Sequence, residues 1–365
     1  MIDAGEMAPA TGDEPALVEI SIAAGEGLPE EDTPTRPFNA PLPDPVNALA
    51  SEVAAGEILR DRFRLEEEVA RGSVGVVFRA TDLMKLEANA EDPLVAVKLV
   101  TAEFMNDKNA LRAFQNEVAN TQHLSHPNIV HLFELNRDGD RIFITMEWLE
   151  GESLAGLLDS SRGSALPPTQ TYAIIEQLCD ALIYAHEHNV VHADVKPGNV
   201  FLTESGELKL IDFGIARLDV ESSADTDAAQ QEATALTPAY ASCERLEKAD
   251  PTAQDDLFSL AGLIYRLLAG RRVFGSLTAL EAEEQAIEPV RIGGLSDERW
   301  SAISQALAYR RVDRQKSIVE FSEHFGRRSK PRDASDETSE RYENTVNSLP
   351  FRNQMKWTVP SLIRF

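Results

Sequence analysis

Acidic, basic and amide side chains between residues 192 and 214 carry the densest chemical signal in the sequence. The run HADVKPGN occupies residues 192–199, and DFG follows at 212–214. Phosphoryl transfer from a nucleoside triphosphate needs a carboxylate beside the acceptor hydroxyl and oxygen ligands for a divalent metal ion. We therefore expect Asp194 to orient the acceptor and Lys196 to neutralise the transferred group. We expect Asn199 and Asp212 to hold magnesium. The alternative is an Asx-turn loop with capping acids.

A glycine-containing turn precedes this run by about 120 residues. The segment VARGSVGVV covers residues 69–77 and lies between two runs with strand character. Glycine lets backbone N–H groups approach phosphate oxygens closely, so Gly72 and Gly75 are candidates for a phosphate cradle. On its own the segment is equally compatible with an ordinary hairpin turn.

A lysine inside an apolar strand is the third feature. Lys98 ends the run VAVK at residues 95–98, where a charge is costly without a partner. The next predicted helix offers Glu117, and an ion pair between the two would aim the ammonium group at the α- and β-phosphates. The alternative is a lysine that reaches solvent from a strand end and a glutamate on a solvated helix face.

The elements that would position these residues fall into two halves. Valine- and phenylalanine-rich runs at 63–69, 74–80, 94–100, 129–135 and 141–148 predict strands, with a helix near 111–121. After residue 153, apolar residues at three- and four-residue spacing predict long helices, notably at 169–188 and 254–268. A β-rich half followed by a helical half predicts an α+β fold with a cleft between two lobes.

Composition sets the outer limits of this domain and argues against some partners. Residues 1–57 contain twelve acidic residues and a single basic one, Arg36, and show no periodicity, so we expect residues 1–58 to be a disordered acidic tail. The domain then covers 59–326, and residues 327–365 form a polar C-terminal tail whose role and partners the sequence does not reveal. The net charge of −26 disfavours nucleic acid as a partner.

Cysteine content and hydropathy favour a cytoplasmic protein. Cys179 and Cys243 are too few for a disulfide framework, which favours reduced thiols. No run approaches eighteen consecutive apolar residues, so no transmembrane segment is expected.

Taken together, these motifs resemble the eukaryotic-type protein kinase family, in particular the bacterial serine/threonine kinases, over about residues 62–325. The resemblance implies a bilobal protein kinase fold, with a small β-rich N-lobe at about 59–147, a larger helical C-lobe at about 148–326, and ATP in the cleft. It implies ATP with Mg²⁺, or Mn²⁺, as cofactors and protein Ser/Thr hydroxyls as acceptors. It also implies that Glu244 pairs with Arg314 and that Asp256 anchors the catalytic loop.

The resemblance further implies which residues surround the nucleotide. Met146 matches the gatekeeper of the ITMEWL segment at 144–149, and Glu147 and Leu149 would offer backbone groups to adenine. The apolar walls of the same pocket match the following side chains: Val69, Val77, Ala96 and Phe201. Lys196 and the segment around Thr237 resemble the serine/threonine class.

The sequence departs from the family pattern at four places. Ala70 replaces the first glycine of the phosphate loop, and Cys243 replaces a proline. The connection at 84–93 is long and acidic, which predicts a solvated loop. Ala193 stands where the family usually has an arginine that binds a phosphate on the activation loop, the segment that ends at residues 237–244. We therefore expect activity to depend little on phosphorylation of that loop.

Two other functions share these motifs. A pseudokinase scaffold would keep the fold without phosphoryl transfer, and a small-molecule phosphotransferase of the same fold would use another acceptor. The first is disfavoured because the sequence keeps every residue that transfer requires: Lys98, Glu117, Asp194, Asn199 and Asp212. The DFG run, Lys196 and the segment at 237–244 argue against the second.

Overall fold

The computed structural model describes residues 53–72, 75–101, 108–160, 165–213 and 238–326, without the side chains of residues 108–110, 113 and 117. The chain clusters into two units, Met1–Pro43 and Asp44–Phe365, and all described residues belong to the second. The expectations for the tails at 1–52 and 327–365, and for Thr237, lie outside the described residues.

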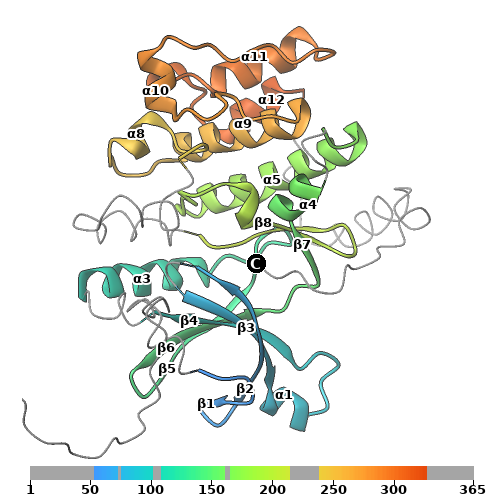
Figure 1. Ribbon diagram of the computed structural model, residues 1–365, viewed down its shortest axis with the longest axis vertical. Helices are drawn as coiled ribbons and strands as arrows, with labels where there is room; N and C mark the ends of the chain where they lie inside the picture. Colours follow the sequence, from blue (N-terminus) through green and yellow to red (C-terminus); the bar gives the residue numbers. More distant parts are fainter. Residues whose placement is uncertain (1–52, 73–74, 102–107, 161–164, 214–237, 327–365) are drawn as a thin grey trace, which may run out of the picture. The chain divides into compact units, whose positions relative to one another are not determined.

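The N-terminal lobe is built on a six-stranded antiparallel sheet (Figure 1). Its strands are β1 (Ile58–Leu59), β2 (Phe63–Arg71), β3 (Gly75–Asp82), β4 (Leu94–Val100), β5 (Leu132–Asp138) and β6 (Arg141–Glu147), in the order β1-β2-β3-β4-β6-β5. Alternating burial along β2 places Phe63 and Leu65 in a core with Phe143. Helix α3 (Lys108–Thr121) packs beside β5 and contributes Phe114 and Val118 to a second cluster.

Two expectations for this lobe need correction. The connection at 84–93 is largely exposed, as expected, but it begins with a short helix, α1 (Leu83–Glu87). The buried Asp82 side chain caps this helix by accepting from the Met84 N–H at 3.1 Å. The strand expected from residue 129 begins only at Leu132. Ile129 instead forms an isolated parallel bridge with Leu210, so an apolar run that looks like one strand is divided between two sheets.

The domain also begins earlier than expected. Residues 53–58, which the composition assigned to the tail, are folded: Val53 packs against the sheet core, and the Gly56 N–H donates to the Leu65 carbonyl at 2.7 Å. Glu57 pairs with Arg141 at 2.5 Å between Oε1 and the guanidinium. Composition could not reveal these contacts because each involves a residue distant in the sequence.

The C-terminal lobe is helical, with one small antiparallel sheet on the side toward the N-terminal lobe (Figure 1). The sheet contains β7 (Gly151–Ser153), β8 (Val200–Thr203) and β9 (Leu208–Leu210). The helices are α4 (Leu154–Ser160), α5 (Pro168–Glu187), α8 (Cys243–Leu246), α9 (Ala253–Ala269), α10 (Ala279–Glu284), α11 (Asp297–Ala306) and α12 (Ile318–His324), with two 3-10 turns, η3 (Pro197–Asn199) and η4 (Arg311–Asp313).

Helix α9 is the centre of this lobe. Leu257, Leu260, Leu263 and Leu267 are fully buried, so the helix is covered by its neighbours on nearly all sides. Its N-terminus carries a capping box between Thr252 and Asp255, and it ends at Gly270 in a left-handed conformation. A buried, doubly capped helix is a rigid support for the loops that contact it. No helix in the described part of the chain has the length and hydropathy needed to span a membrane.

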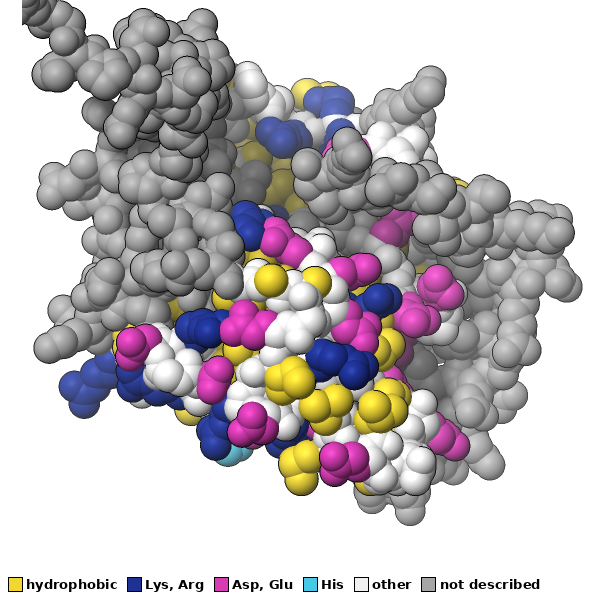
Figure 2. Space-filling model, turned by 60° about the horizontal axis from the view of Figure 1, so that its bottom comes forward, with side chains coloured by type: hydrophobic (Ala, Val, Ile, Leu, Met, Phe, Trp, Pro, Cys, Tyr) yellow, Lys and Arg dark blue, Asp and Glu magenta, His cyan; other side chains and the backbone are white. Residues whose placement is uncertain are grey.

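The arginines of the N-terminal lobe are mostly paired with acids. Figure 2 shows acidic, basic and apolar side chains interspersed on one face of this lobe. Six arginines have a carboxylate within 4.0 Å: Arg62, Arg64, Arg71, Arg79, Arg137 and Arg141.

Candidate active site

The loop that carries Asp194 is held by a single buried carboxylate. Asp256, 1% exposed at the start of α9, accepts from the His192 N–H through Oδ2 and from the Ala193 N–H through Oδ1, both at 2.8 Å. Ala193 has φ 66°, a conformation that alanine adopts at a cost of about 1–2 kcal/mol. The two charge-assisted hydrogen bonds stabilise this turn. The expected anchoring role of Asp256 is confirmed.

Asp194 and its two predicted partners lie together. Lys196 Nζ is 2.6 Å from Asp194 Oδ2, and Asn199 Nδ2 donates to the same oxygen at 2.8 Å. Asn199 also donates to the Asp194 carbonyl at 2.9 Å, which fixes the loop on η3. The Asp194 carboxylate is therefore oriented by a cation and an amide while its other oxygen, Oδ1, accepts no hydrogen bond from the described residues.

Lys98 and Asp212 come from different lobes and form an ion pair. Lys98 Nζ lies 2.7 Å from Asp212 Oδ1, and the Lys98 side chain is 9% exposed. Burial raises the pKa of Asp212, but the Lys98 ammonium, with smaller contributions from His192 and Lys196, brings that pKa below its usual value. Asp212 is therefore an anion at neutral pH. The side chain of Glu117 lies outside the described residues, so its predicted pairing with Lys98 stays a prediction.

Strand register places the predicted nucleotide residues next to one another. Val77 is opposite Lys98 on β3 and β4, and Ala96 is opposite Met146 on β4 and β6. Ala96 is buried, while the remaining predicted contacts are half-buried: Val69, Val77, Met146, Glu147, Leu149 and Phe201. A cavity of about 20 Å³ next to these strands is lined by Lys98, Met146 and Asp212, among others.

The two loop glycines differ in how tightly they are packed. A Cβ on Gly75 would overlap the Leu99 carbonyl oxygen, whereas a Cβ on Gly72 would meet nothing closer than the Gly75 carbonyl oxygen at 4.0 Å. Gly72 also donates its N–H to that carbonyl at 2.9 Å, which closes the turn. Residues 73 and 74 of the loop lie outside the described residues.

Glu147 lies in the segment at 144–149 that joins the two lobes, here called the hinge, and its side chain has a role that the sequence did not reveal. Its Oε1 accepts from the His131 N–H at 2.8 Å and from Lys209 Nζ at 3.1 Å. Lys209 lies on β9, two residues before the loop of Asp212, so this carboxylate links the hinge to the C-terminal lobe. No local sequence signal connects residues 147 and 209.

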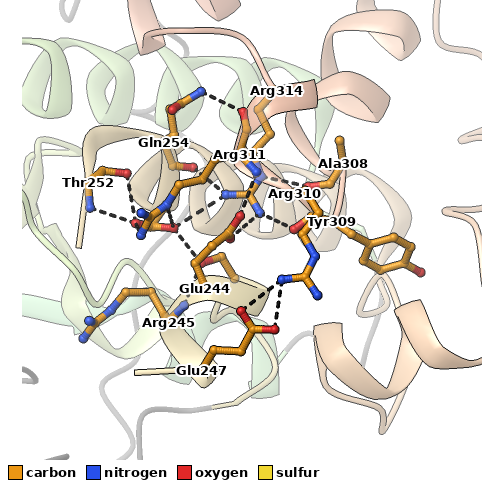
Figure 3. Close-up of polar contacts among 12 residues, drawn as sticks. Glu244, Arg245, Glu247, Thr252, Gln254, Ala308, Tyr309, Arg310, Arg311 and Arg314 are labelled. Carbon is orange, nitrogen blue, oxygen red and sulfur yellow. Dashed lines mark hydrogen bonds and ion pairs between the residues drawn. The ribbon is translucent and has the colours of Figure 1, made fainter. Parts of the chain in front are cut away.

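A network of arginines and acids supports the segment after Tyr240 (Figure 3). The predicted pair is confirmed: Arg314, with its side chain 0% exposed, lies 2.8 Å from Glu244 Oε2. Arg311 forms two hydrogen bonds with Asp255, at 3.1 and 2.6 Å, and Asp255 also accepts from Ser242 Oγ at 2.7 Å. Asp255 therefore joins the segment at 242 to both α9 and η4. The contributions of Arg311 and Asp255 were missed because neither residue belongs to a recognisable motif.

The cysteine of this segment is chemically quiet. Cys243 is fully buried, and burial, together with the nearby Glu283, raises the pKa of its thiol to about 12. Both Cys179 and Cys243 are free and buried. Cys243 thus serves as a small core residue rather than as a nucleophile.

The oxygen atoms near Asp212 suit a hard divalent cation. Magnesium binds through one or two carboxylates together with substrate phosphates, rather than in an all-protein cage. The Asp212 carboxylate and the Asn199 amide oxygen provide that type of donor. Among the described residues no group of three or more His, Cys, Asp or Glu side chains is arranged to hold a metal ion by itself.

Several bacterial kinases are similar to this chain. The probable serine/threonine-protein kinase PknB of Lactococcus lactis is 30% identical over 62% of this chain and 35% of its own length. The serine/threonine-protein kinase PrkC of Bacillus subtilis is 27% identical over 67% of this chain and 36% of its own length. The serine/threonine-protein kinase PkaA of Streptomyces coelicolor is 32% identical over 69% of this chain and 47% of its own length. The chain thus spans less than half the length of these curated relatives.

Solved structures and the family model extend the comparison. The kinase domain of Mycobacterium tuberculosis PknI has a TM-score of 0.58 at 22% identity, covering 75% of this chain and 98% of that one. The structure described as PpkA-294 apo form has a TM-score of 0.62 at 19% identity, covering 75% and 99%. These two show the fold. The protein kinase domain model matches residues 63–324. With the catalytic loop, the Lys98–Asp212 pair and the bilobal fold in place, the chain belongs to the protein kinase domain family.

Proposed function

We propose that this chain is a serine/threonine protein kinase that transfers the γ-phosphoryl group of ATP to protein hydroxyls. The observation that carries the proposal is the convergence of Asp194, Lys196 and Asn199 on one loop. That loop is hydrogen-bonded to Ile211, next to Asp212 and its partner Lys98. Each has the chemistry that phosphoryl transfer requires. The names of the relatives support the proposal.

Asp194 orients the acceptor. Its carboxylate is held by Lys196 and Asn199, so a serine or threonine hydroxyl donates a hydrogen bond to an oxygen that is already in position. Lys196 then lies within reach of the phosphoryl group and offsets its charge. Asn199 and Asp212 would hold Mg²⁺, which would supply positive charge to offset that of the phosphate oxygens.

Lys98 positions the phosphates. In the described residues its ammonium is paired with Asp212. Asp212 would hold a metal ion, and Lys98 beside it would be placed to contact the α- and β-phosphates of a bound nucleotide. Because positioning and electrostatic stabilisation account for most of the catalysis of phosphoryl transfer, loss of Lys98 is expected to lower the rate more than the affinity.

The test separates binding from transfer. We expect Asp194→Asn to lower phosphorylation of myelin basic protein or casein by about 10²–10⁴-fold with little change in ATP affinity by calorimetry. Asp212→Ala should weaken magnesium-dependent ATP binding and abolish transfer together. Wild-type protein without magnesium-dependent nucleotide binding, or an Asp194→Asn variant with normal transfer, would refute the proposal.

We also propose protein substrates rather than nucleic acid, and a cytoplasmic site of action. The net charge of −26 supports the first, because it repels a phosphate backbone at long range. The two free, buried cysteines support the second, because they fit a reducing compartment.

A further inference from the structure

Tyr240 lies along one side of α9, against Ser259 and Gly262. Ser259 Oγ donates to the Tyr240 carbonyl at 2.8 Å, and a Cβ on Gly262 would touch the Tyr240 ring at 3.5 Å. Residues 259, 262 and 266 have the three- and four-residue spacing of one helix face. Burial raises the pKa of the Tyr240 hydroxyl above its ordinary value, while the nearby positive charges of Arg272, just beyond the helix end, and of Arg266 oppose that rise.

The guanidinium groups at this end of α9 lack acidic partners. Arg266 donates to the Gly270 carbonyl, and Arg271 lies 5.6 Å from the ring centre of Tyr265. Among the described residues no carboxylate lies within ion-pair distance of Arg266, Arg271 or Arg272. Arg271 and Arg272 are exposed. In contrast, the arginines at 310, 311 and 314 in the same lobe all have carboxylate partners.

This cationic group lies within reach of a peptide bound at Asp194. Asp256 holds the backbone next to Asp194, and Arg266 follows ten residues later on α9, about 15 Å along the helix axis. An extended peptide rises about 3.3 Å per residue, so that distance corresponds to roughly four or five residues. Helix α4, which packs on η3 of the catalytic loop, brings Asp159 into electrostatic range of Tyr240. The Tyr240 hydroxyl is therefore near both α9 and α4, and each of these helices contacts the loop that carries Asp194.

We propose that Arg266 and Arg272, at the end of α9 next to Tyr240, bind an anionic side chain of the protein substrate within about five residues of the acceptor. Aspartate, glutamate and phosphoserine share the required chemistry, because guanidinium groups form charge-assisted hydrogen bonds with carboxylate and phosphate oxygens. An enzyme of net charge −26 repels acidic peptides at long range, so selecting one requires a local group of cations such as this one. The inference rests on the proposed kinase activity.

A peptide scan with the full chain tests the proposal. Each of the five positions on either side of a central serine is replaced in turn by Asp, phosphoserine, Ala or Lys, and kcat and KM are measured separately. We expect an anionic residue at one or two positions to raise kcat/KM on the order of tenfold or more over alanine, mainly through KM. The Asp and phosphoserine arms distinguish an acidic sequence from a previously phosphorylated one.

Substitutions assign the preference to the two arginines. The double variant Arg266→Gln with Arg272→Gln should reduce the preference for an acidic peptide over the alanine peptide to below about twofold. Its kcat/KM on the alanine peptide should stay unchanged. The single variant Arg272→Glu should instead prefer a peptide with lysine at the same position. Arg271→Gln is the matched control, because its guanidinium lies over Tyr265, and it should keep the preference.

Three results would overturn the inference: no acidic preference in the wild type, an unchanged preference in the double variant, or an equal loss on the alanine peptide. Another result is a double variant that loses the acidic preference only while the enzyme is phosphorylated. That result would show that the arginines bind a phosphate group of this chain rather than the substrate, and it would overturn the inference as well. Failure to phosphorylate any protein would instead refute the kinase activity itself.

Discussion

At the scale of single residues, the catalytic loop depends on one acid that satisfies two backbone donors. Left unpaired, the N–H groups of His192 and Ala193 would each cost about 1–3 kcal/mol, because both are buried. The resemblance predicted that Asp256 anchors this loop. The left-handed conformation of Ala193 could not be predicted, because alanine carries no preference for it.

Gly75 and Gly72 offer a matched pair of substitutions at this scale. Because a Cβ on Gly75 overlaps the Leu99 carbonyl oxygen, Gly75→Ala should force β3 away from β4 and destabilise the domain by about 1–3 kcal/mol. It should also weaken ATP binding, since Val77 and Lys98 are neighbours in the same two strands. Thermal unfolding and ATP titration measure both effects.

Gly72→Ala is the control, because its Cβ would enter open space. Its melting temperature should stay close to that of the wild type, and any change should be confined to nucleotide affinity. Equal destabilisation by the two substitutions would show that the tight packing of Gly75 is not what requires a glycine there.

At the scale of elements, sequence patterns located most strands and helices but not their long-range pairing. The run at 94–100 is strand β4 with the predicted limits, and α5 and α9 differ from prediction by one residue at each end. The apolar run from Ile129 was misassigned, because periodicity does not show that Leu210, eighty residues away, is its partner. Helix α1 was missed because its capping residue, Asp82, is also held by Arg62 at 2.7 Å, a tertiary contact.

The η4 network predicts a large difference between two nearby arginines. Arg314→Met removes a fully buried guanidinium and leaves Glu244, 13% exposed, without its partner, so it should destabilise the domain by about 3–5 kcal/mol. Arg310→Met breaks pairs with Glu247 and Glu283, but its side chain is 40% exposed, so its cost should be at most about 1 kcal/mol. Urea unfolding at neutral pH measures both.

The same network predicts how the difference depends on pH. Burial raises the pKa values of Glu244 and Asp255, but hydrogen bonds and nearby arginines bring both below their ordinary values of 4.5 and 3.8. A carboxylate with a lowered pKa stabilises the fold above its ordinary pKa and loses that contribution as the pH falls through the folded-state value. The gap between wild type and Arg314→Met should therefore be constant from pH 7 to 5 and shrink below about pH 4. A gap that widens on acidification would contradict the ion-pair explanation.

At the scale of the whole molecule, charge is spread over the tail and the folded unit. Residues 1–57 carry twelve acids and one base, a net charge of −11 of the total −26, so the remaining residues carry −15. Composition placed residues 53–58 in the tail. It missed their part in the fold, because Val53 and Glu57 contribute through contacts with β2, β6 and the sheet core.

Two truncations test where the folded domain begins. Deleting residues 1–52 removes no described contact, so the melting temperature should change by less than about 2 °C. Deleting residues 1–59 also removes Leu59, which is 0% exposed, the pairing of β1 with β2, and the Glu57–Arg141 ion pair. Burial of one leucine alone contributes about 1.5–3 kcal/mol. For a domain of this size, 1 kcal/mol shifts the melting temperature by about 2–4 °C, so the longer deletion should lower it by about 5 °C or more.

A substitution separates the apolar contact from the length of the deletion. Leu59→Ala in the chain that starts at residue 53 should reproduce a large part of the loss, whereas Ile58→Ala, at a position 45% exposed, should not. ATP binding should persist in all four proteins at temperatures below unfolding, because none of the predicted nucleotide residues precedes Val69. If the shorter deletion alone lowered the melting temperature by more than about five degrees, the acidic segment would be part of the folded structure, and the boundary would lie before residue 53.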